Sequence, residues 1–531
     1  MESTNTNLSD KNCSESYNPA TGELIGKSIL TNPDEISGII SAARKAQIDW
    51  GGTPLKNRIR IIGNLKRIIA ADGDEISRVI TADNGKTRIE AMATEVLPAA
   101  MAASYYCSNA KRFLKAEKLK GGNIFLLNKR SRIYKVPYGV VGIISPWNYP
   151  FSIPFSEVVM ALLAGNAVIL KTASETQQVG LKLKELFEKA GIPENVFNYV
   201  NIPGRIAGEL FLKGGVDKLF FTGSVAVGKK LMSLAGDTLT PVVLELGGND
   251  PMIVCRDADL DRAAYGALWG GFQNGGQSCG GVERIYVHEK VYDDFLSKLK
   301  PLVENLIPGN GNDFNTQMGC LTTGKQAETV RAHIKDALES GAVVFARSTK
   351  IEELGEGNFV PAMVMTNVNH NMLLMKDETF GPVVGVMKFN DYEEAVRLAN
   401  DSYLGLTASV WSRNRRFAVE LGRKLKAGAV TINDHLMSHG LAETPWGGFK
   451  QSGIGRTHGE LGFAEMVQHQ VIVDDIFTFM KKNLWWHGYN KALFGGLNGL
   501  LQFLYSDKFK YRLNGLKKLM KIFPRVFSAK N

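Results

Sequence analysis

Cysteine is scarce in this 531-residue sequence, which contains only five. None of them forms a Cys-x-x-Cys pair, and an odd number leaves no complete set for a disulfide framework. Scattered single cysteines are typical of proteins from a reducing compartment, and they argue against a thiolate zinc site. The eight histidines include no His-Glu-x-x-His motif, so we predict no metal centre. The cysteines are Cys13, Cys107, Cys255, Cys279 and Cys320.

The sequence also lacks a secretory signal and a long uninterrupted apolar run. Residues 1–16 are polar, without the basic start and apolar stretch of a signal peptide, and we expect them to form a mobile polar arm. Residues 484–505 are the best candidate for a membrane span, but Lys491 and Gln502 interrupt them. These absences favour a cytoplasmic protein that does not cross a bilayer.

Net charge is absent from most of the chain. The formal charge is +10, and residues 476–531 alone contain eleven Lys or Arg against one acid, Asp507. Residues 1–475 are therefore balanced, which argues against a nucleic-acid-binding body. The positive charge belongs to a C-terminal extension.

Short β-rich runs alternate with helical stretches through most of the sequence. Two helices come first, at residues 35–50 and 55–84, and we expect a break in the second near Gly73. From Tyr138 onward, strand-like runs alternate with longer helices, which is the pattern of βαβ units in a parallel sheet covered on both faces. A second such series begins at Pro251. We therefore predict an α/β fold with two α/β domains.

A glycine-rich loop, GGQSCGG, surrounds Cys279. Glycines let the backbone approach a substrate closely and direct N–H groups toward a developing oxyanion. A thiolate in such a loop is a good nucleophile toward a carbonyl carbon. A single cysteine is more often a small buried hydrophobe, so this motif alone leaves both interpretations open.

Two further polar residues follow apolar strand-like runs. Glu245 lies in LELGGND, a position where open α/β sheets hold ligands, and burial would suit it to activate water as a general base. Asn148 lies in SPWNYP, where two prolines could fix its amide as an oxyanion donor. A buried structural acid and a turn residue are the alternatives.

The junction FTGSVAVG has glycines at 223 and 228, not the GxGxxG of a standard dinucleotide fingerprint. A helix N-terminus beside Ser224 can still hold a pyrophosphate. An ordinary strand-to-helix turn capped by Ser224 explains the same residues equally well. This motif by itself therefore identifies no cofactor.

Six motifs taken together resemble the aldehyde dehydrogenase superfamily in order and approximate spacing: SPWNYP, FTGS, LELGG, FQNGGQSC, DETFGPV and PWGGFKQSGIGR. The resemblance covers about residues 15–475. It implies a Rossmann-like cofactor domain, an α/β catalytic domain and a small bridging β-sheet used in homodimers. A tetramer is the alternative assembly. The expected segments are 17–115 and 138–247 for the cofactor domain, 248–450 for the catalytic domain, 116–137 and 451–475 for the bridging elements, and 476–531 for the extension.

The same resemblance implies a role for each matching residue. Cys279 would be the nucleophile and Glu245 the general base, while Asn148 and the Cys279 backbone N–H would form the oxyanion hole. The expected reaction is oxidation of an aldehyde through a Cys279 thioester, which water hydrolyses to a carboxylic acid. NAD or NADP would be the cofactor, in contact with Trp147, Lys171, Ser174, Gly223, Ser224, Glu378 and Phe380.

Ser174 departs from the pattern of many NAD-preferring members. These carry Glu three residues after the matching lysine, whereas here Glu175 comes one residue later. A small hydroxyl beside Lys171 leaves room for the 2′-phosphate of NADP. We therefore expect that NADP is at least accepted.

The extension at residues 476–531 goes beyond the part that matches soluble members. Its apolar residues recur at spacings of three and four, and Pro524 is expected to end or kink that helix. A basic helix with an apolar face favours peripheral binding to an anionic membrane surface, and packing on the protein itself is the alternative. The stripe consists of Phe509, Leu513, Leu516, Met520, Phe523 and Phe527.

Membrane association favours a hydrophobic long-chain aldehyde, fatty or isoprenoid-derived, as the substrate. A semialdehyde dehydrogenase for a small polar substrate is one alternative, which basic residues in the substrate pocket would indicate. A non-catalytic binding protein on this fold is another, and the intact set of Cys279, Glu245 and Asn148 argues against it. Nucleic-acid binding by the tail is a third option, but we expect no such partner.

Overall fold

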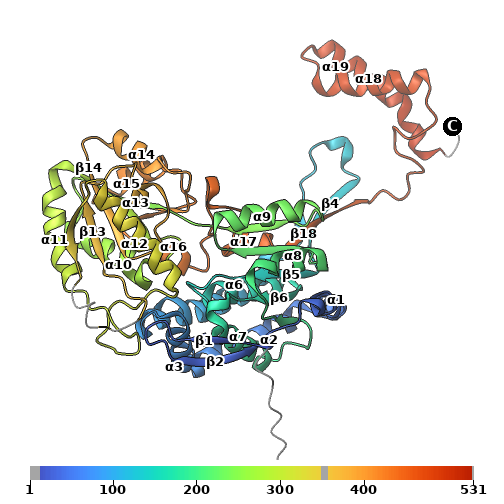
Figure 1. Ribbon diagram of the computed structural model, residues 1–531. Coiled ribbons are helices and arrows are strands. Elements are labelled where there is room, and N and C mark those ends of the chain that lie inside the picture. Colours follow the sequence, from blue (N-terminus) through green and yellow to red (C-terminus); the bar gives the residue numbers. More distant parts are fainter. Residues whose placement is uncertain (1–11, 349–353, 355–356, 529–531) are drawn as a thin grey trace, which may run out of the picture. The chain divides into compact units, whose positions relative to one another are not determined.

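The computed structural model describes residues 12–348, 354 and 357–528, and the chain divides into two compact units (Figure 1). Unit 1 consists of Met1–Leu114 and Val136–Gln468, and unit 2 of Lys115–Lys135 and His469–Asn531. Unit 1 contains two large sheets and their helices, which confirms the predicted α/β fold.

The first sheet of unit 1 has six strands, of which five run parallel. In spatial order they are β17 (Gly453–Ile454), β9 (Val242–Glu245), β8 (Lys218–Thr222), β5 (Val140–Ile144), β6 (Ala167–Lys171) and β7 (Phe197–Tyr199). The connecting helices are α6 (Ser152–Ala164), α7 (Gln177–Lys189), α8 (Gly204–Gly214) and α9 (Val225–Gly236).

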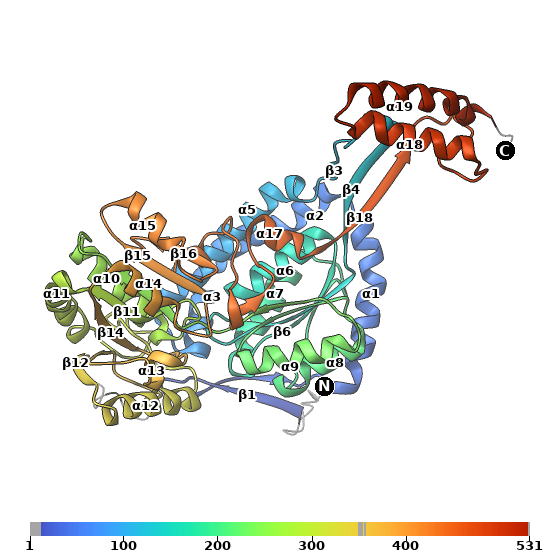
Figure 2. The same ribbon diagram turned by 90° about the horizontal axis from the view of Figure 1, so that it is seen from above.

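Alternate side chains of β6 enter two different apolar cores. Val168 and Leu170 pack into the core shared with α6 and α7, whereas Ala167 and Ile169 pack into the core shared with α8. This follows from the two-residue period of a strand whose faces are both covered. The helices accordingly lie on opposite sides of the sheet (Figure 2).

The second sheet of unit 1 has seven strands, and only its β12–β13 pairing is antiparallel. In spatial order they are β12 (Val343–Arg347), β13 (Met363–Thr366), β14 (Val383–Phe389), β11 (Val282–His288), β10 (Asp250–Val254), β15 (Thr407–Trp411) and β16 (Ala429–Ile432). Its helices are α10 (Leu260–Phe272), α11 (Tyr292–Glu304), α12 (Gly324–Glu339), α13 (Leu373–Lys376), α14 (Tyr392–Asn400), α15 (Arg415–Gly422) and α16 (Met437–Gly440).

The N-terminal helices break at a different place from the one predicted. The stretch 55–84 divides at Gly63, where the Asn64 N–H bonds the carbonyl of Ile61 and the four-residue ladder is interrupted. Gly73 instead lies inside a helix, buried against the side chains of Val96 and Met92, so it serves packing. The helices of this region are α1 (Ile36–Gly52), α2 (Leu55–Ile62), α3 (Leu65–Asn84), α4 (Arg88–Ala91) and α5 (Leu97–Phe113).

The prediction that residues 1–16 form a mobile polar arm is partly wrong. Cys13–Tyr17 forms strand β1, which pairs antiparallel with β2 (Leu24–Ile29) and buries Ser16. The pairing supplies backbone hydrogen bonds that a polar composition does not reveal. Residues 1–11 of the predicted arm lie outside the described residues.

A three-stranded sheet combines β18 (Val467–Asp475), β4 (Lys129–Pro137) and β3 (Glu117–Lys118), in that order. Residues 116–137 thus contain a hairpin, as expected for a bridging element. The other expected bridging segment, 451–475, is divided, because β17 pairs with β9 in the six-stranded sheet and only β18 joins the small one. The short helix α17 (Gly459–Ala464) lies between them in sequence.

The C-terminal extension forms a helical hairpin, α18 (Lys491–Tyr505) and α19 (Phe509–Ile522), followed by a 3-10 turn at Phe523–Phe527 that includes Pro524. The two helices approach through glycines: a Cβ on Gly515 would lie 2.3 Å from the Gly499 carbonyl oxygen. Leu493, Leu519 and Ile522 form the small core beside them. Among the described residues, no helix is both long and apolar enough to cross a bilayer.

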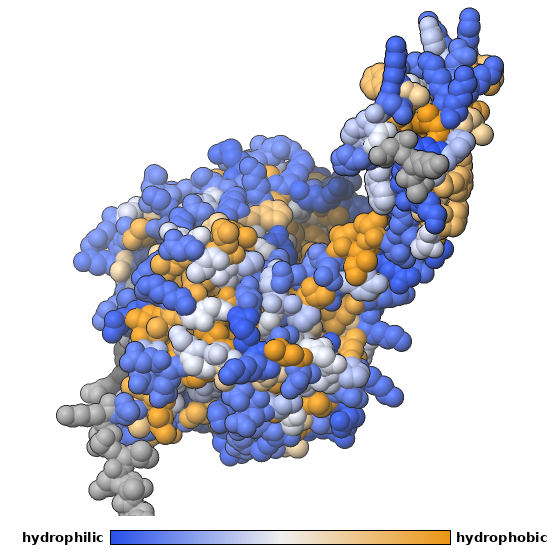
Figure 3. Space-filling model, turned by 90° about the vertical axis from the view of Figure 1, so that its right-hand side faces the viewer, coloured by the Kyte–Doolittle hydropathy of each residue, from blue (hydrophilic) through white to orange (hydrophobic). Residues whose placement is uncertain are grey.

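The predicted apolar stripe of α19 is not the face that packs on α18. The packed face consists of Gly515, Leu519 and Ile522. Each of these comes one residue before a member of the predicted stripe. Phe509 is 78% exposed and Met520 61% exposed. The surface of these helices therefore shows apolar side chains among hydrophilic ones (Figure 3).

Candidate functional site

The loop that carries Cys279 depends on its glycines. Asn274, Gly275 and Gly276 all have positive φ, a conformation that glycine adopts without steric cost. A Cβ on Gly276 would lie 2.1 Å from the Gly381 carbonyl oxygen, so a larger residue would displace the neighbouring chain. The loop leaves α10, and these turns direct Cys279 into the space between the two sheets of unit 1.

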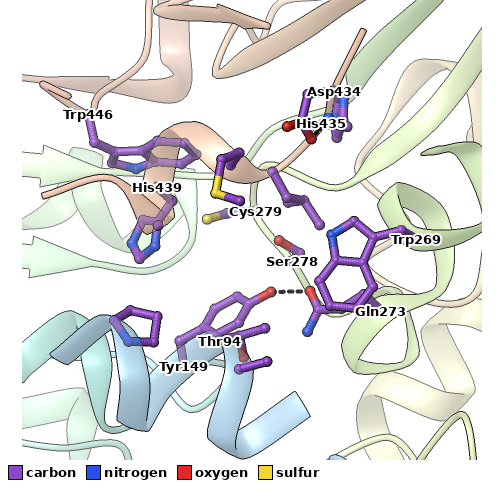
Figure 4. A pocket seen from close by; sticks show the side chains of 15 residues that line it. Thr94, Tyr149, Trp269, Gln273, Ser278, Cys279, Asp434, His435, His439 and Trp446 are labelled. Carbon is purple, nitrogen blue, oxygen red and sulfur yellow. Dashed lines mark hydrogen bonds between the residues drawn. The ribbon is translucent and has the colours of Figure 1, made fainter. Parts of the chain in front are cut away.

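A mainly apolar and aromatic cavity of about 130 Å³ lies on one side of Cys279 (Figure 4). Burial lowers the pKa of His435 and His439 in its wall to about 4, so both are neutral at physiological pH. No Lys or Arg lines it among the described residues. Its walls include Tyr149, Trp269, Gln273, Asp434, His435, Leu436, Met437, His439 and Trp446.

A larger cavity of about 470 Å³ lies on the other side of Cys279. It holds five of the seven residues expected at the cofactor. Three of them, Trp147, Gly223 and Ser224, follow the carboxyl ends of β5 and β8, where open α/β sheets hold ligands. Within the described chain, Cys279 is the one residue that lines both cavities. The five are Trp147, Gly223, Ser224, Glu378 and Phe380.

The second cavity offers polar groups that fit a dinucleotide. Gly247 lies so close to Glu378 that a Cβ there would be 2.2 Å from the carboxylate, and the Gly248 N–H donates to Glu378 over 3.0 Å. Ser224 caps α9, whose N-terminus opens toward the cavity. The rings of Trp147 and Phe380 meet edge to face, with centroids 5.4 Å apart.

Lys171 and Ser174, the other two expected cofactor contacts, are absent from the walls of this cavity among the described residues. Lys171 is buried at the end of β6, and burial lowers its pKa while the charge of Glu175 opposes that shift. Ser174 is exposed, and Glu175 lines the cavity instead. The sequence drew attention to Ser174, but its neighbour Glu175 is the residue that lines the cavity.

Glu245 ends β9 and lines the larger cavity. Its side chain is buried, and neither carboxylate oxygen has a hydrogen-bond partner among the described residues. Burial raises the pKa of Glu245 well above its usual value, and the charge of Glu157 adds to this effect. An unpartnered buried carboxylate is costly to the fold, so its presence points to chemistry rather than to structure.

Asn148 is held beside the Cys279 loop from both ends. Its side-chain amide donates to the Gln277 carbonyl over 3.1 Å. Its own backbone carbonyl accepts from the Lys86 ammonium over 2.8 Å and from the Asn274 amide over 2.9 Å. The amide is therefore a fixed donor next to the nucleophile expected from the sequence.

The Cys279 thiol is protonated at neutral pH in this state. Burial raises its pKa far above the usual value, and the nearby carboxylates of Glu378, Asp250 and Glu245 raise it further. A thiolate forms here only when a positive charge or a base offsets these effects.

The buried ion pair of Lys86 and Glu95 was not predicted from the sequence. The two side chains are fully buried, with Nζ 2.7 Å from Oε1. Glu95 also accepts hydrogen bonds from the backbone N–H groups of Phe151 and Ser152, which directly follow the SPWNYP motif. A Lys with an acid nine residues away gives no local signal of such a role.

Comparisons with known proteins agree on one family. The profile of the aldehyde dehydrogenase family matches residues 6–472. The chain is 36% identical over 489 residues to "4,4'-diapolycopene aldehyde oxidase" of Methylomonas sp, covering 92% of this chain and 91% of that protein. It is 35% identical over 459 residues to a protein of Mycolicibacterium smegmatis named "Putative succinate-semialdehyde dehydrogenase" for NADP(+), covering 86% and 88%. The NAD+ complex of a Bacillus cereus aldehyde dehydrogenase superposes with a TM-score of 0.82 at 33% identity, covering 87% of this chain and 93% of that one.

Proposed function

The chain belongs to the aldehyde dehydrogenase family, and on that premise we propose that this NAD(P)-dependent enzyme oxidises a hydrophobic long-chain aldehyde through a thioester on Cys279. The observation that carries the proposal is the position of Cys279 between an apolar cavity and one that fits a dinucleotide. The first cavity would hold the aldehyde and the second the cofactor.

Carbon–sulfur bond formation begins the reaction. The Cys279 thiol first releases its proton to solvent, and the resulting thiolate attacks the aldehyde carbon, so that the carbonyl oxygen becomes an oxyanion. The Asn148 amide and the Cys279 backbone N–H donate to this oxygen, each contributing roughly 3 kcal/mol to the transition state. The Asn148 amide nitrogen carries two N–H groups, so one can stay on the Gln277 carbonyl while the other donates to the oxyanion. The oxyanion then re-forms the carbonyl as the C–H bond of the former aldehyde breaks, which leaves a thioester on Cys279; NAD or NADP, when bound, would accept that hydride.

Hydrolysis completes the reaction. Glu245 takes a proton from a water molecule, whose oxygen attacks the thioester carbon, and the acid leaves as Cys279 regains its thiolate. The raised pKa of Glu245 makes the carboxylate a stronger base than an exposed glutamate would be. The free carboxylate oxygens leave both lone-pair sites open to water.

The walls of the smaller cavity support a neutral, apolar substrate. Tyr149, Trp269 and Trp446 supply aromatic surface, and the two buried histidines are uncharged. The sole ionisable acid among its described lining residues is Asp434. A semialdehyde that carries a carboxylate would need a positive partner in such a site, so the semialdehyde alternative has less support.

The first experiment measures formation of the reduced cofactor by absorbance with aldehydes of about two to sixteen carbons and with succinate semialdehyde. We expect kcat/KM to rise with chain length, and Cys279→Ala to show no activity. A clear preference for succinate semialdehyde would overturn the proposed substrate and retain the family. Turnover by Cys279→Ala would overturn the thioester mechanism.

The C-terminal hairpin supports action at an anionic membrane surface. Phe509, Leu513 and Met520 form an exposed apolar line along α19. Lys510 and Lys517 lie seven residues apart at one edge of this line, and Lys521 continues that edge four residues later. A helix with this arrangement lies in the interface, with its apolar face in the acyl region and its lysines at the headgroups.

Co-sedimentation with vesicles tests this location. Lys510→Gln/Lys517→Gln/Lys521→Gln should weaken binding to phosphatidylglycerol vesicles about a hundredfold, since each lysine contributes about 1 kcal/mol at such a surface. The matched control removes the same charge elsewhere, as Lys45→Gln/Lys66→Gln/Lys230→Gln, all exposed in unit 1. Equal binding by wild type to phosphatidylcholine vesicles, or equal loss in the control, would reject an anionic surface.

The exposed edge strand β18 supports a homodimer. Val471, Ile472 and Val473 are 55%, 47% and 58% exposed, and the outer edge of β18 has no partner strand within the described chain. Long apolar edges of this kind are normally covered. Light scattering should report a dimer of wild type, and Ile472→Lys should shift it toward monomer.

A further inference from the structure

A third cavity of unit 1 lies beside the small apolar one and is larger, at about 830 Å³. Its walls come from the start of α4, from one face of α10, from the end of α11, and from the segment between α11 and α12. Five large apolar side chains in these walls are exposed: Ile89 (59%), Tyr265 (61%), Trp269 (43%), Ile307 (41%) and Phe314 (69%). Isolated apolar residues on a surface need no explanation, but a set that lines one hollow indicates a binding site. We call this hollow the outer groove.

The outer groove and the cavity at Cys279 share two wall residues, Trp269 and Gln273. These lie four residues apart, so they occupy the same face of α10 and its end. Gln273 is fixed, because its side-chain oxygen accepts a hydrogen bond from the Tyr149 hydroxyl over 2.7 Å (Figure 4). Trp269 is 43% exposed. The indole therefore lies between the two spaces, with the surface beyond it open.

The cavity at Cys279 is too small for a long substrate. Its volume of about 130 Å³ compares with roughly 300–1,000 Å³ for pockets that enclose a drug-sized ligand. An aldehyde with a long hydrocarbon chain can place only its first carbons there. The remainder has to pass outward, and the shared wall makes the outer groove the adjoining apolar surface.

We propose that the outer groove binds the distal hydrocarbon chain of the aldehyde, which enters the site past Trp269. The proposal rests on the proposed function, since it assumes a long apolar substrate. Charge agrees with it, because no Lys or Arg lines the groove among the described residues. Its one acid, Glu90, is buried, and its carboxylate accepts from the backbone N–H groups of Asn274 and Thr87. The described lining of the groove thus carries no exposed charge of its own, and the guanidinium of Arg88 lies 5.9 Å from the centroid of the Phe314 ring.

A pair of exposed wall residues allows a clean test. Ile89→Gln/Phe314→Gln removes apolar surface from the groove without entering the small cavity. We expect kcat/KM for hexadecanal to fall by at least about tenfold, since lost apolar contacts in substrate pockets cost about 1–3 kcal/mol. The value for propanal should not change. The matched control is Ile48→Gln/Leu338→Gln, at apolar residues 69% and 45% exposed outside the groove.

The outcomes separate this proposal from the proposed function. Wild type active on propanal but not on hexadecanal would reject the long-chain substrate, and the groove proposal with it. Wild type active on hexadecanal, with the groove variant unchanged, would reject the groove alone. An equal loss for both aldehydes would also reject it, because the substitutions would then act on the whole enzyme. A change in oligomeric state by light scattering would identify the groove as an interface between copies.

Discussion

The Lys86 ammonium donates a hydrogen bond over 2.8 Å to the backbone carbonyl of Asn148, and no part of the lysine side chain reaches solvent. Glu95 balances this charge and at the same time holds the backbone just after Pro150. The expected oxyanion donor is therefore anchored by a buried ion pair on a different segment of unit 1. We therefore expect that breaking the Lys86–Glu95 pair lowers both the stability of the fold and the rate of catalysis.

Replacing Lys86 tests that link. Lys86→Met leaves the Glu95 carboxylate buried without its partner, which should lower the free energy of unfolding by about 3–5 kcal/mol. We also expect a lower kcat with little change in cofactor affinity, because Asn148 loses an anchor. Urea unfolding and steady-state kinetics measure the two effects. Lys66→Met, at an exposed position of α3, is the control, and an unchanged kcat in folded Lys86→Met would refute the positioning role.

The reactivity of Cys279 should depend steeply on pH in the cofactor-free enzyme. Burial and three nearby carboxylates raise the pKa of its thiol, so the thiolate fraction should keep rising with pH through the neutral range. Alkylation by iodoacetamide, followed by mass spectrometry of the Cys279 peptide, measures this fraction. A rate that levels off near neutral pH would show that an unseen positive group lowers the pKa.

Glu245→Gln should separate activity from stability. The variant should form the thioester in a single burst of reduced cofactor and then stall, because water lacks its base. The folded-state pKa of Glu245 is raised, so the wild type loses stability as pH rises above the unfolded-state pKa of the carboxyl. Glutamine carries no titratable group, so the variant does not lose stability in this way as the pH rises. Its advantage in Tm should therefore be small at pH 4 and grow toward pH 8, and a constant difference across this range would contradict the shift.

Cofactor preference should respond to Glu175 and not to Ser174. Glu175 lines the cofactor cavity and its charge acts on Lys171, so its carboxylate should repel a 2′-phosphate. Glu175→Gln should raise the ratio of kcat/KM for NADP to that for NAD by about tenfold, equivalent to about 1.4 kcal/mol. Ser174→Ala is the matched control at the next residue. A larger change in this ratio with Ser174→Ala than with Glu175→Gln would support the interpretation from the sequence, in which Ser174 sets the cofactor preference.

Sequence patterns predicted this fold where the physical signal is local. The alternation of buried strands and amphipathic helices gave β5, β6 and β8, since each of these has a buried, apolar central run. Glycine and proline patterns drew attention to Cys279, Glu245 and Asn148, and the resemblance of six motifs to the family implied their roles. The break at Gly63 was missed because a helix interior tolerates one glycine, and Gly73 looked the same in sequence.

Features that depend on distant segments could not be predicted in this way. The apolar stripe of α19 was visible as a period, but the buried face was decided by contact of Gly515 with Gly499 on another helix. In the same way, only the tertiary structure shows that Glu175, and not Ser174, faces a cavity. Burial of Lys86 likewise has no counterpart in local composition.

The position of Cys279, as the one described residue in the walls of both cavities, has a consequence for how such an enzyme can change. Substitutions in the walls of one chamber do not touch the other, so the range of aldehydes and the choice of cofactor can be altered independently. Directed evolution toward a new aldehyde could therefore target α10, α16 and the outer groove while the dinucleotide chamber stays constant. A substitution of Cys279 itself would affect both chambers, because this residue lines both.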